Sequence, residues 1–213
     1  VGIIAHELGH LLGLPDLFDT GFTGQISSSS QSDSGPADDS AGIGYWGLMG
    51  HGARGWNDLG GPVSFTPWSL ARLGWLGAEN DHLVVVDQTL TGLRIDDYGG
   101  GGFVYRIPLE QQSYLLVEHR RADGSYYDRR IPNDGLLIWQ VNDSRGNNNN
   151  ELSKLVDLVC ADGRFADAGF PQGQQDAPVT GGDNLDFWAH DDDYRTAHSG
   201  NLGDGTDVFD GVR

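Results

Sequence analysis

The sequence predicts an α+β protein, and two features of the chain carry this prediction. A segment with a helical pattern of apolar residues ends at Leu12, and a second segment with helix start and stop signals ends at Leu73. Five short segments rich in β-branched and aromatic residues follow Trp75, and turn residues separate them. We therefore expect two units: residues 1–76, which hold both helices, and residues 77–213, a β-rich region with many Asp and Gly residues.

The first segment, Val1–Leu12, is predicted to be an amphipathic helix. A helix advances about 100° per residue, so apolar side chains such as Ile4 and Leu8 share one face. His6 and His10 lie on the opposite side. We expect the apolar face to pack in the core and the two histidines to face a cleft.

The second helix is predicted over Pro67–Leu73, after a long polar loop at Gly21–Ile43. Thr66 is a preferred N-cap residue, and Pro67 suits the first helical position because its missing N–H has no helical partner there. Gly74 is typical of a helix end.

The strands are predicted from short apolar runs that turn residues such as Asp123 and Gly124 separate. Successive short strands with tight turns favour a mostly antiparallel sheet. The predicted strands are His82–Val86, Phe103–Pro108, Tyr114–His119, Gly135–Asn142 and Leu155–Cys160.

The charge of the chain narrows the classes of function. Its 213 residues hold 31 acidic and 13 basic side chains, a formal net charge of −18. Binding to the phosphate backbone of a nucleic acid needs Lys and Arg, so neither nucleic acid nor an anionic membrane is an expected partner. Cys160 is the only cysteine, which excludes an internal disulfide and a cysteine-rich zinc site.

One motif in the first helix points to metal chemistry. His6 and His10 are four residues apart, so both imidazoles can bind one metal ion from the same helix face. Glu7 can reach a water molecule on that metal without being a ligand. Gly13 allows a sharp turn that brings Asp16 back as a third ligand and leaves a fourth position for water.

The identity of the third ligand stays open at this point. Asp19 is the nearest competitor to Asp16, and a Glu from elsewhere in the chain is a second alternative. The downstream Glu residues lie in predicted strands or loops rather than in a matching helix motif. Asp16 is the assignment that we favour.

The segment His6-Glu7-Leu8-Gly9-His10-Leu11-Leu12-Gly13-Leu14-Pro15-Asp16 resembles the signature of the metzincin metallopeptidases, with Asp16 in place of the third histidine. Metzincins also carry a methionine turn beneath the metal. Met49, the only methionine, lies in a glycine-rich stretch and matches that turn. Its alternative role is that of a residue that fills a gap in the core.

The resemblance narrows to the secreted bacterial metallopeptidases of the immune inhibitor A family. Residues 6–19 carry it, and the similarity runs through most of the chain and is strongest over the first 76 residues. Gln140 stands where the family leads us to expect His. The further segments that resemble the family are Tyr45–Met49, Trp68–Trp75, Tyr114–Arg120 and Gly135–Val141.

This resemblance implies a secreted zinc endopeptidase that acts on proteins or peptides, with Glu7 as the general base for zinc-activated water. It also implies structural calcium. In metzincins a sheet precedes the active-site helix, whereas at most five residues precede His6. We therefore expect this chain to be an internal piece that exposes the apolar face of its first helix and cleaves little by itself.

Other side chains are weaker candidates. Tyr45, Trp46 and His51 flank Met49 and are candidates to line the cleft, although Tyr45 and Trp46 are at least as well explained by packing beneath the zinc. An acidic cluster is a candidate for calcium because Ca²⁺ prefers oxygen ligands, or else it is a solvated loop. Its residues are Asp183, Asp186, Asp191 and Asp193.

Two other functions compete with the peptidase. One is a calcium-dependent extracellular binding or structural module whose zinc motif no longer works; the presence of Glu7 argues against it. The other is a zinc hydrolase that does not act on peptides, against which the methionine turn argues.

Overall fold

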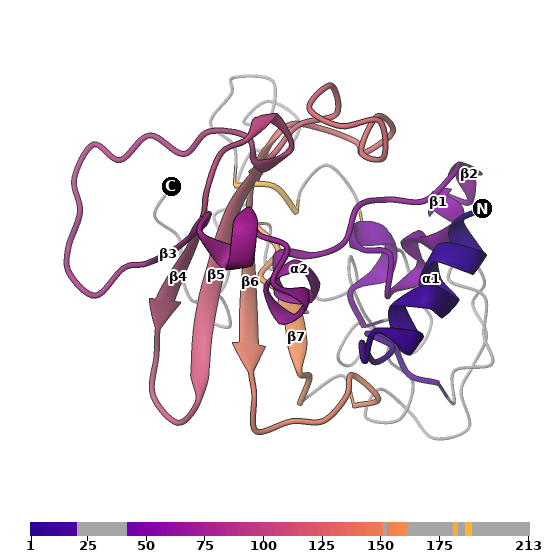
Figure 1. Ribbon diagram of the computed structural model, residues 1–213, viewed down its shortest axis with the longest axis horizontal. Helices are drawn as coiled ribbons and strands as arrows, with labels where there is room; N and C mark the ends of the chain where they lie inside the picture. The colour runs from indigo at the N-terminus through magenta and orange to yellow at the C-terminus, as the bar shows by residue number, and fades with distance from the viewer. Residues whose placement is uncertain (21–41, 151–152, 162–180, 183–185, 189–213) are drawn as a thin grey trace.

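The computed structural model describes residues 1–20, 42–150, 153–161, 181–182 and 186–188. Within these residues it confirms the α+β class, with two α-helices and a mixed, mostly antiparallel sheet (Figure 1). None of the helices in this part of the chain has the length and apolar character that crossing a membrane requires. The elements in order are α1 (Gly2–Leu11), η1 (Gly44–Trp46), η2 (His51–Arg54), β1 (Gly55–Trp56), β2 (Leu59–Gly60), α2 (Pro67–Leu73), η3 (Ala78–Asn80), β3 (Leu83–Val85), η4 (Tyr98–Gly100), β4 (Val104–Pro108), β5 (Ser113–Arg120), β6 (Gly135–Asn142) and β7 (Val156–Leu158).

The main sheet has five strands in the order β3-β4-β5-β6-β7. All five lie where the sequence predicts strands. The pairs β4–β5, β5–β6 and β6–β7 are antiparallel. β3 and β4 pair parallel, a departure from the antiparallel expectation. The chain between them, residues 86–103, is long enough to return to the same end of the sheet, which a parallel pair requires.

The sheet buries side chains on both faces because alternate residues of a strand point to opposite sides. On β5, Tyr114 and Leu116 pack in the larger core, while Leu115 and Val117 join a smaller cluster on the other face. The larger core contains residues from both predicted units, and Trp46 packs in it. The boundary at residue 76 stays a prediction.

Helix α2 follows the sequence prediction closely. The Thr66 Oγ1 accepts a hydrogen bond from the Ser69 N–H at 3.2 Å, and Pro67 takes the first position. Gly74 ends the helix with a φ of 74°, a left-handed conformation that glycine adopts without strain. Trp68 is buried, and the helix contacts β5, so α2 fixes the segment before it against the sheet.

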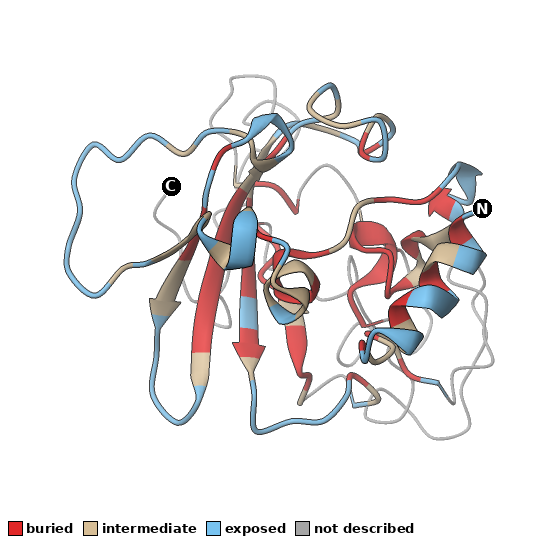
Figure 2. Ribbon diagram, viewed as in Figure 1, coloured by how far each residue is buried: buried red, intermediate tan, exposed pale blue. Residues whose placement is uncertain are grey.

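Helix α1 exposes the face that the sequence predicts to be apolar (Figure 2). Ile4 is 66% exposed and Leu8 52% exposed, so the expectation that they pack in the core is wrong. The buried side carries Gly2 and Gly9, because segment 42–66 approaches the helix too closely there for larger side chains. The expectation of an exposed apolar face holds for this chain.

Candidate metal centre

The two histidines of α1 point their rings at a common place. The ring centroids of His6 and His10 are 4.7 Å apart, and the two Nε2 atoms are 3.1 Å apart. This closeness follows from their spacing, because residues four apart lie above one another on a helix. His6 is 8% exposed, and His10 is half-buried.

The chain reverses directly after α1 and brings Asp16 to the histidines. Gly13 donates its N–H to the His10 carbonyl, and Leu14 donates its N–H to the Gly9 carbonyl, the pair of bonds of a Schellman motif. Gly13 has a φ of 90°, which an L side chain rarely adopts. The Asp16 Oδ1 then lies 3.0 Å from the His6 Nε2 and 3.4 Å from the His10 Nε2.

Two backbone carbonyls fix which nitrogen of each ring carries a proton. The His6 Nδ1 lies 2.8 Å from the Leu48 carbonyl oxygen, and the His10 Nδ1 lies 2.8 Å from the Leu14 carbonyl oxygen. A carbonyl oxygen only accepts, so both Nδ1 atoms must donate. Each neutral imidazole therefore presents the lone pair of its Nε2 toward the other ring and toward Asp16.

This arrangement fits a zinc ion. Three electron-pair donors converge, and the Asp16 Oδ1 is buried without accepting a hydrogen bond. Such a group repels itself unless a cation lies among its atoms. Four ligands at 2.0–2.1 Å around a tetrahedral zinc are separated by about 3.3 Å, close to the 3.0–3.4 Å separations between Asp16 and the two rings.

The electrostatics agree with a site built for positive charge. Contact with the Asp16 carboxylate raises the pKa of His6, because a protonated ring would bond to Asp16, although burial opposes that rise. Glu7 adds to it through its charge and is exposed. Within the part of the chain that the structure describes, His6, His10 and Asp16 are the side chains grouped closely enough to hold a metal ion. Asp19 is buried and does not belong to the group.

Met49 packs against helix α1. Its side chain is 1% exposed, and its sulfur is so near that a Cβ on Gly9 would come within 2.5 Å of it. The Met49 carbonyl accepts the N–H of Leu17 at 2.9 Å, so the same residue also contacts the segment after Asp16. Met49 therefore contacts both α1 and the segment after Asp16, and the methionine turn stays a prediction.

Of the three residues that flank Met49, two pack in the core and the third lies near the histidines of α1. Tyr45 and Trp46 are buried members of the core, and Trp46 lies edge-on to Trp56 with 4.5 Å between the ring centroids. This is the packing alternative that the sequence left open. His51 lies beside Phe18, which lies in turn beside His6. Burial lowers the pKa of His51 to about 4, so its ring is neutral near pH 7.

The acidic cluster proposed for calcium lies mostly outside the described residues, namely Asp183, Asp191 and Asp193. Asp186 is described, and it is fully buried. Its Oδ2 accepts a hydrogen bond from the Trp46 indole N–H at 2.6 Å. This contact gives Asp186 a structural role, and a calcium site stays a prediction.

Several groups that shape the site could not be predicted from the sequence. The carbonyl groups of Leu48 and Leu14 orient the histidines, but every residue has a carbonyl, so no pattern of side chains marks them. Arg120 donates to the Trp46 carbonyl from the far strand β5. The sequence does hold one signal for Arg120, namely a charged residue at the end of an apolar strand. Buried charges are rare, so such a residue indicates a specific partner.

Comparison with known proteins bears on the part of the chain that carries this site. Residues 1–71 match the family model described as the catalytic domain of the immune inhibitor A peptidase M6. No curated protein matches the chain, and no solved structure does. The matched residues include α1, Asp16 and Met49. Over this segment the chain is therefore similar to the immune inhibitor A family of peptidases.

Proposed function

We propose that the chain carries the metal centre of a zinc-dependent endopeptidase. The observation that supports this most is the convergence of the His6 Nε2, the His10 Nε2 and the Asp16 Oδ1, with each Nδ1 bonded to a carbonyl. A zinc ion bound there supplies a Lewis acid that acidifies water and polarises a peptide carbonyl. His6, His10 and Asp16 would hold it.

Glu7 is the general base of the proposal. It follows His6 on α1 and is exposed, so its carboxylate is accessible to water and substrate. The carboxylate takes a proton from the attacking water and delivers it to the nitrogen of the departing amine. Its negative charge contributes to the raised pKa of His6, which supports a position close to the proposed ligands.

The substrates are proteins or peptides, and the protein acts outside the cell. The match of residues 1–71 to the peptidase family supports the substrate class. The family resemblance alone supports secretion. A calcium-dependent binding module with an inactive zinc motif is not favoured, since the peptidase family match covers the three converging side chains together with Glu7.

Metal analysis and a cleavage assay test this proposal. The metal-free chain is titrated with zinc against a chromophoric chelator, and casein cleavage by the full-length protein is followed with and without excess chelator. We expect a single tight zinc site, and cleavage that disappears with chelator and returns with zinc. Cleavage that persists without metal, or a chain that binds no zinc, contradicts the proposal.

A further inference from the structure

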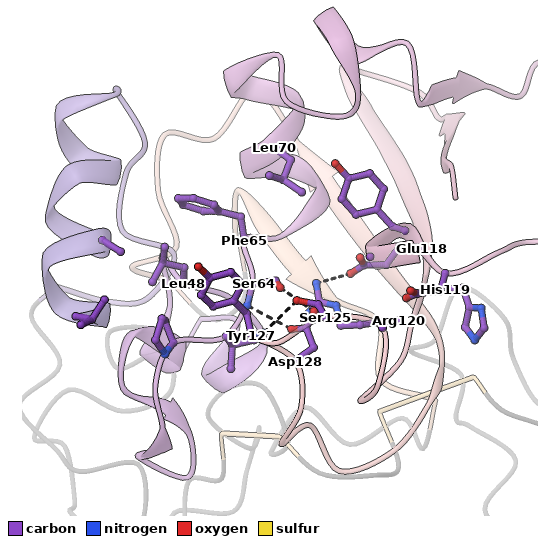
Figure 3. A pocket seen from close by; sticks show the side chains of 18 residues that line it. Leu48, Ser64, Phe65, Leu70, Glu118, His119, Arg120, Ser125, Tyr127 and Asp128 are labelled. Carbon is purple, nitrogen blue, oxygen red and sulfur yellow. Dashed lines mark hydrogen bonds and ion pairs between the residues drawn. The ribbon is translucent and has the colours of Figure 1, made fainter. Parts of the chain in front are cut away.

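A cavity of about 480 Å³ lies between α1, α2 and β5 (Figure 3). Three charged side chains line it and are almost completely buried: Glu118 and Arg120, each 3% exposed, and Asp128, 5% exposed. Removing a charge from water costs several kcal/mol unless the charge is paired. The contacts of these three side chains show what they hold in place.

Arg120 reaches from the sheet to the segment that supports the metal site. Its Nη2 donates to the Glu118 Oε1 at 2.6 Å, and its Nη1 donates to the Trp46 carbonyl at 2.8 Å. The Glu118 Oε1 also accepts the Trp139 indole N–H at 3.0 Å, which fixes the carboxylate. The planar guanidinium is thus oriented by one residue and bonded to another, as its rigid fork of donors allows.

Asp128 reaches the same segment from the loop after β5. Its Oδ2 accepts the Ser64 hydroxyl at 2.7 Å, and its Oδ1 accepts the Ser64 N–H at 3.3 Å. The Ser64 carbonyl in turn accepts the Leu48 N–H at 3.1 Å. Figure 3 shows Ser64 and Asp128 side by side, near Leu48.

The two connections meet at Leu48. Arg120 donates to the carbonyl of Trp46, two residues before Leu48. Asp128 bonds Ser64, whose carbonyl accepts the Leu48 N–H. The Leu48 carbonyl is the group that accepts the hydrogen bond from the His6 Nδ1. A displacement of this short stretch therefore turns the His6 ring and moves its Nε2.

We propose that Arg120 and Asp128 are positioning residues of the metal site, which hold the backbone from Trp46 to Leu48 so that the Leu48 carbonyl orients His6. This proposal rests on the proposed zinc site. Hydrogen bonds from charged groups are shorter and stronger than neutral ones, so they fix a backbone more firmly. Loss of an outer partner of a metal-bound histidine typically weakens metal binding 10–100-fold.

The test compares zinc affinities of folded variants. Arg120→Lys keeps the charge but cannot bond both Glu118 and Trp46 as the guanidinium fork does. Ser64→Ala removes the hydroxyl that bonds Asp128. Arg106→Lys is the matched control, because Arg106 lies on the neighbouring strand β4 and stacks on the Tyr114 ring, 3.9 Å from its centroid.

We expect Arg120→Lys and Ser64→Ala each to weaken zinc binding about tenfold, and Arg106→Lys to leave it within about twofold. Cobalt(II) bound in place of zinc gives a second measurement, because its absorption bands follow ligand geometry. They should shift in the first two variants alone. A role in stability alone would lower the melting temperatures without changing either measurement.

The outcomes separate the two proposals. If the unmodified chain binds no zinc, the proposed function fails first. If it binds zinc and both variants match it in affinity and cobalt spectrum, the positioning role is overturned. Should Arg120→Lys fail to fold, Ser64→Ala decides, because the loss of one hydroxyl changes little else.

Discussion

The sheet and the region of the metal centre are held together in different ways. Strands β4 to β7 pair through regular ladders and bury apolar side chains on both faces. The metal centre lies in residues 1–20 and 42–66. It depends on individual hydrogen bonds between irregular segments, such as the bond that the Leu17 N–H donates to the Met49 carbonyl. The difference indicates that the sheet supplies stability, whereas the irregular region supplies polar groups aimed at one place.

The largest expected effect separates chemistry from metal binding within the irregular region. Glu7→Gln should lower peptidase activity by about 10²–10⁴-fold, because the amide cannot accept the proton. Zinc affinity should stay close to that of the unmodified protein, since Glu7 lies outside the three converging side chains. Initial rates on a fluorescent casein substrate and a zinc titration measure the two quantities. Turnover near normal would remove Glu7 as the base.

The second effect tests the third ligand. Asp16→Ala should weaken zinc binding by more than about 100-fold, because it removes the oxygen that lies 3.0 Å from the His6 Nε2. Asp19→Asn serves as the control, since Asp19 is buried nearby but outside the group. Competition titration of each variant gives the affinities. A larger loss in Asp19→Asn than in Asp16→Ala would move the assignment.

The third effect belongs to the sheet. Leu116 is 1% exposed in the larger core, so Leu116→Ala should lower the free energy of unfolding by about 2–5 kcal/mol. The zinc affinity of the folded variant should not change, because Leu116 touches the core and none of the three ligands. Urea unfolding followed by circular dichroism, together with a zinc titration, checks both statements. A change in zinc affinity as large as that of Asp16→Ala would break the division between the two regions.

The smallest effect concerns the helix that joins the two regions. Thr66→Ala should lower the free energy of unfolding by about 1 kcal/mol, because the Ser69 N–H loses its side-chain acceptor. Thr66→Ser keeps that oxygen and should restore most of the stability. Urea unfolding of both variants measures the difference. Equal losses in the two variants would show that the Thr66 methyl group, rather than the cap, is responsible.

The sequence predicts the sheet strands and α2 well because local rules decide them. Thr66, Pro67 and Gly74 mark both ends of α2, and short apolar runs between turn residues mark the strands. The hairpin of β1 and β2 escapes because each strand has only two residues, too few to show a period. The parallel pairing of β3 with β4 escapes because it depends on the path of residues 86–103 rather than on either strand.

The candidate site divides in the same way. His6, His10 and Asp16 are predictable because their spacing around Gly13 determines where the side chains meet. What holds them is not predictable, since the Leu48 carbonyl and its connection to Arg120 come from segments that are distant in the sequence. The buried side of α1 is also missed, because close approach at Gly9, rather than hydrophobicity, decides it.

X-ray absorption spectroscopy of the zinc-loaded chain tests the central claim most directly. The structure predicts zinc bound by two imidazole nitrogens and one carboxylate oxygen at about 2.0–2.1 Å, with the oxygen contribution altered in Asp16→Ala and the nitrogen contributions in His6→Ala and His10→Ala. A spectrum without imidazole scattering, or one that these substitutions leave unchanged, would contradict the metal centre proposed here.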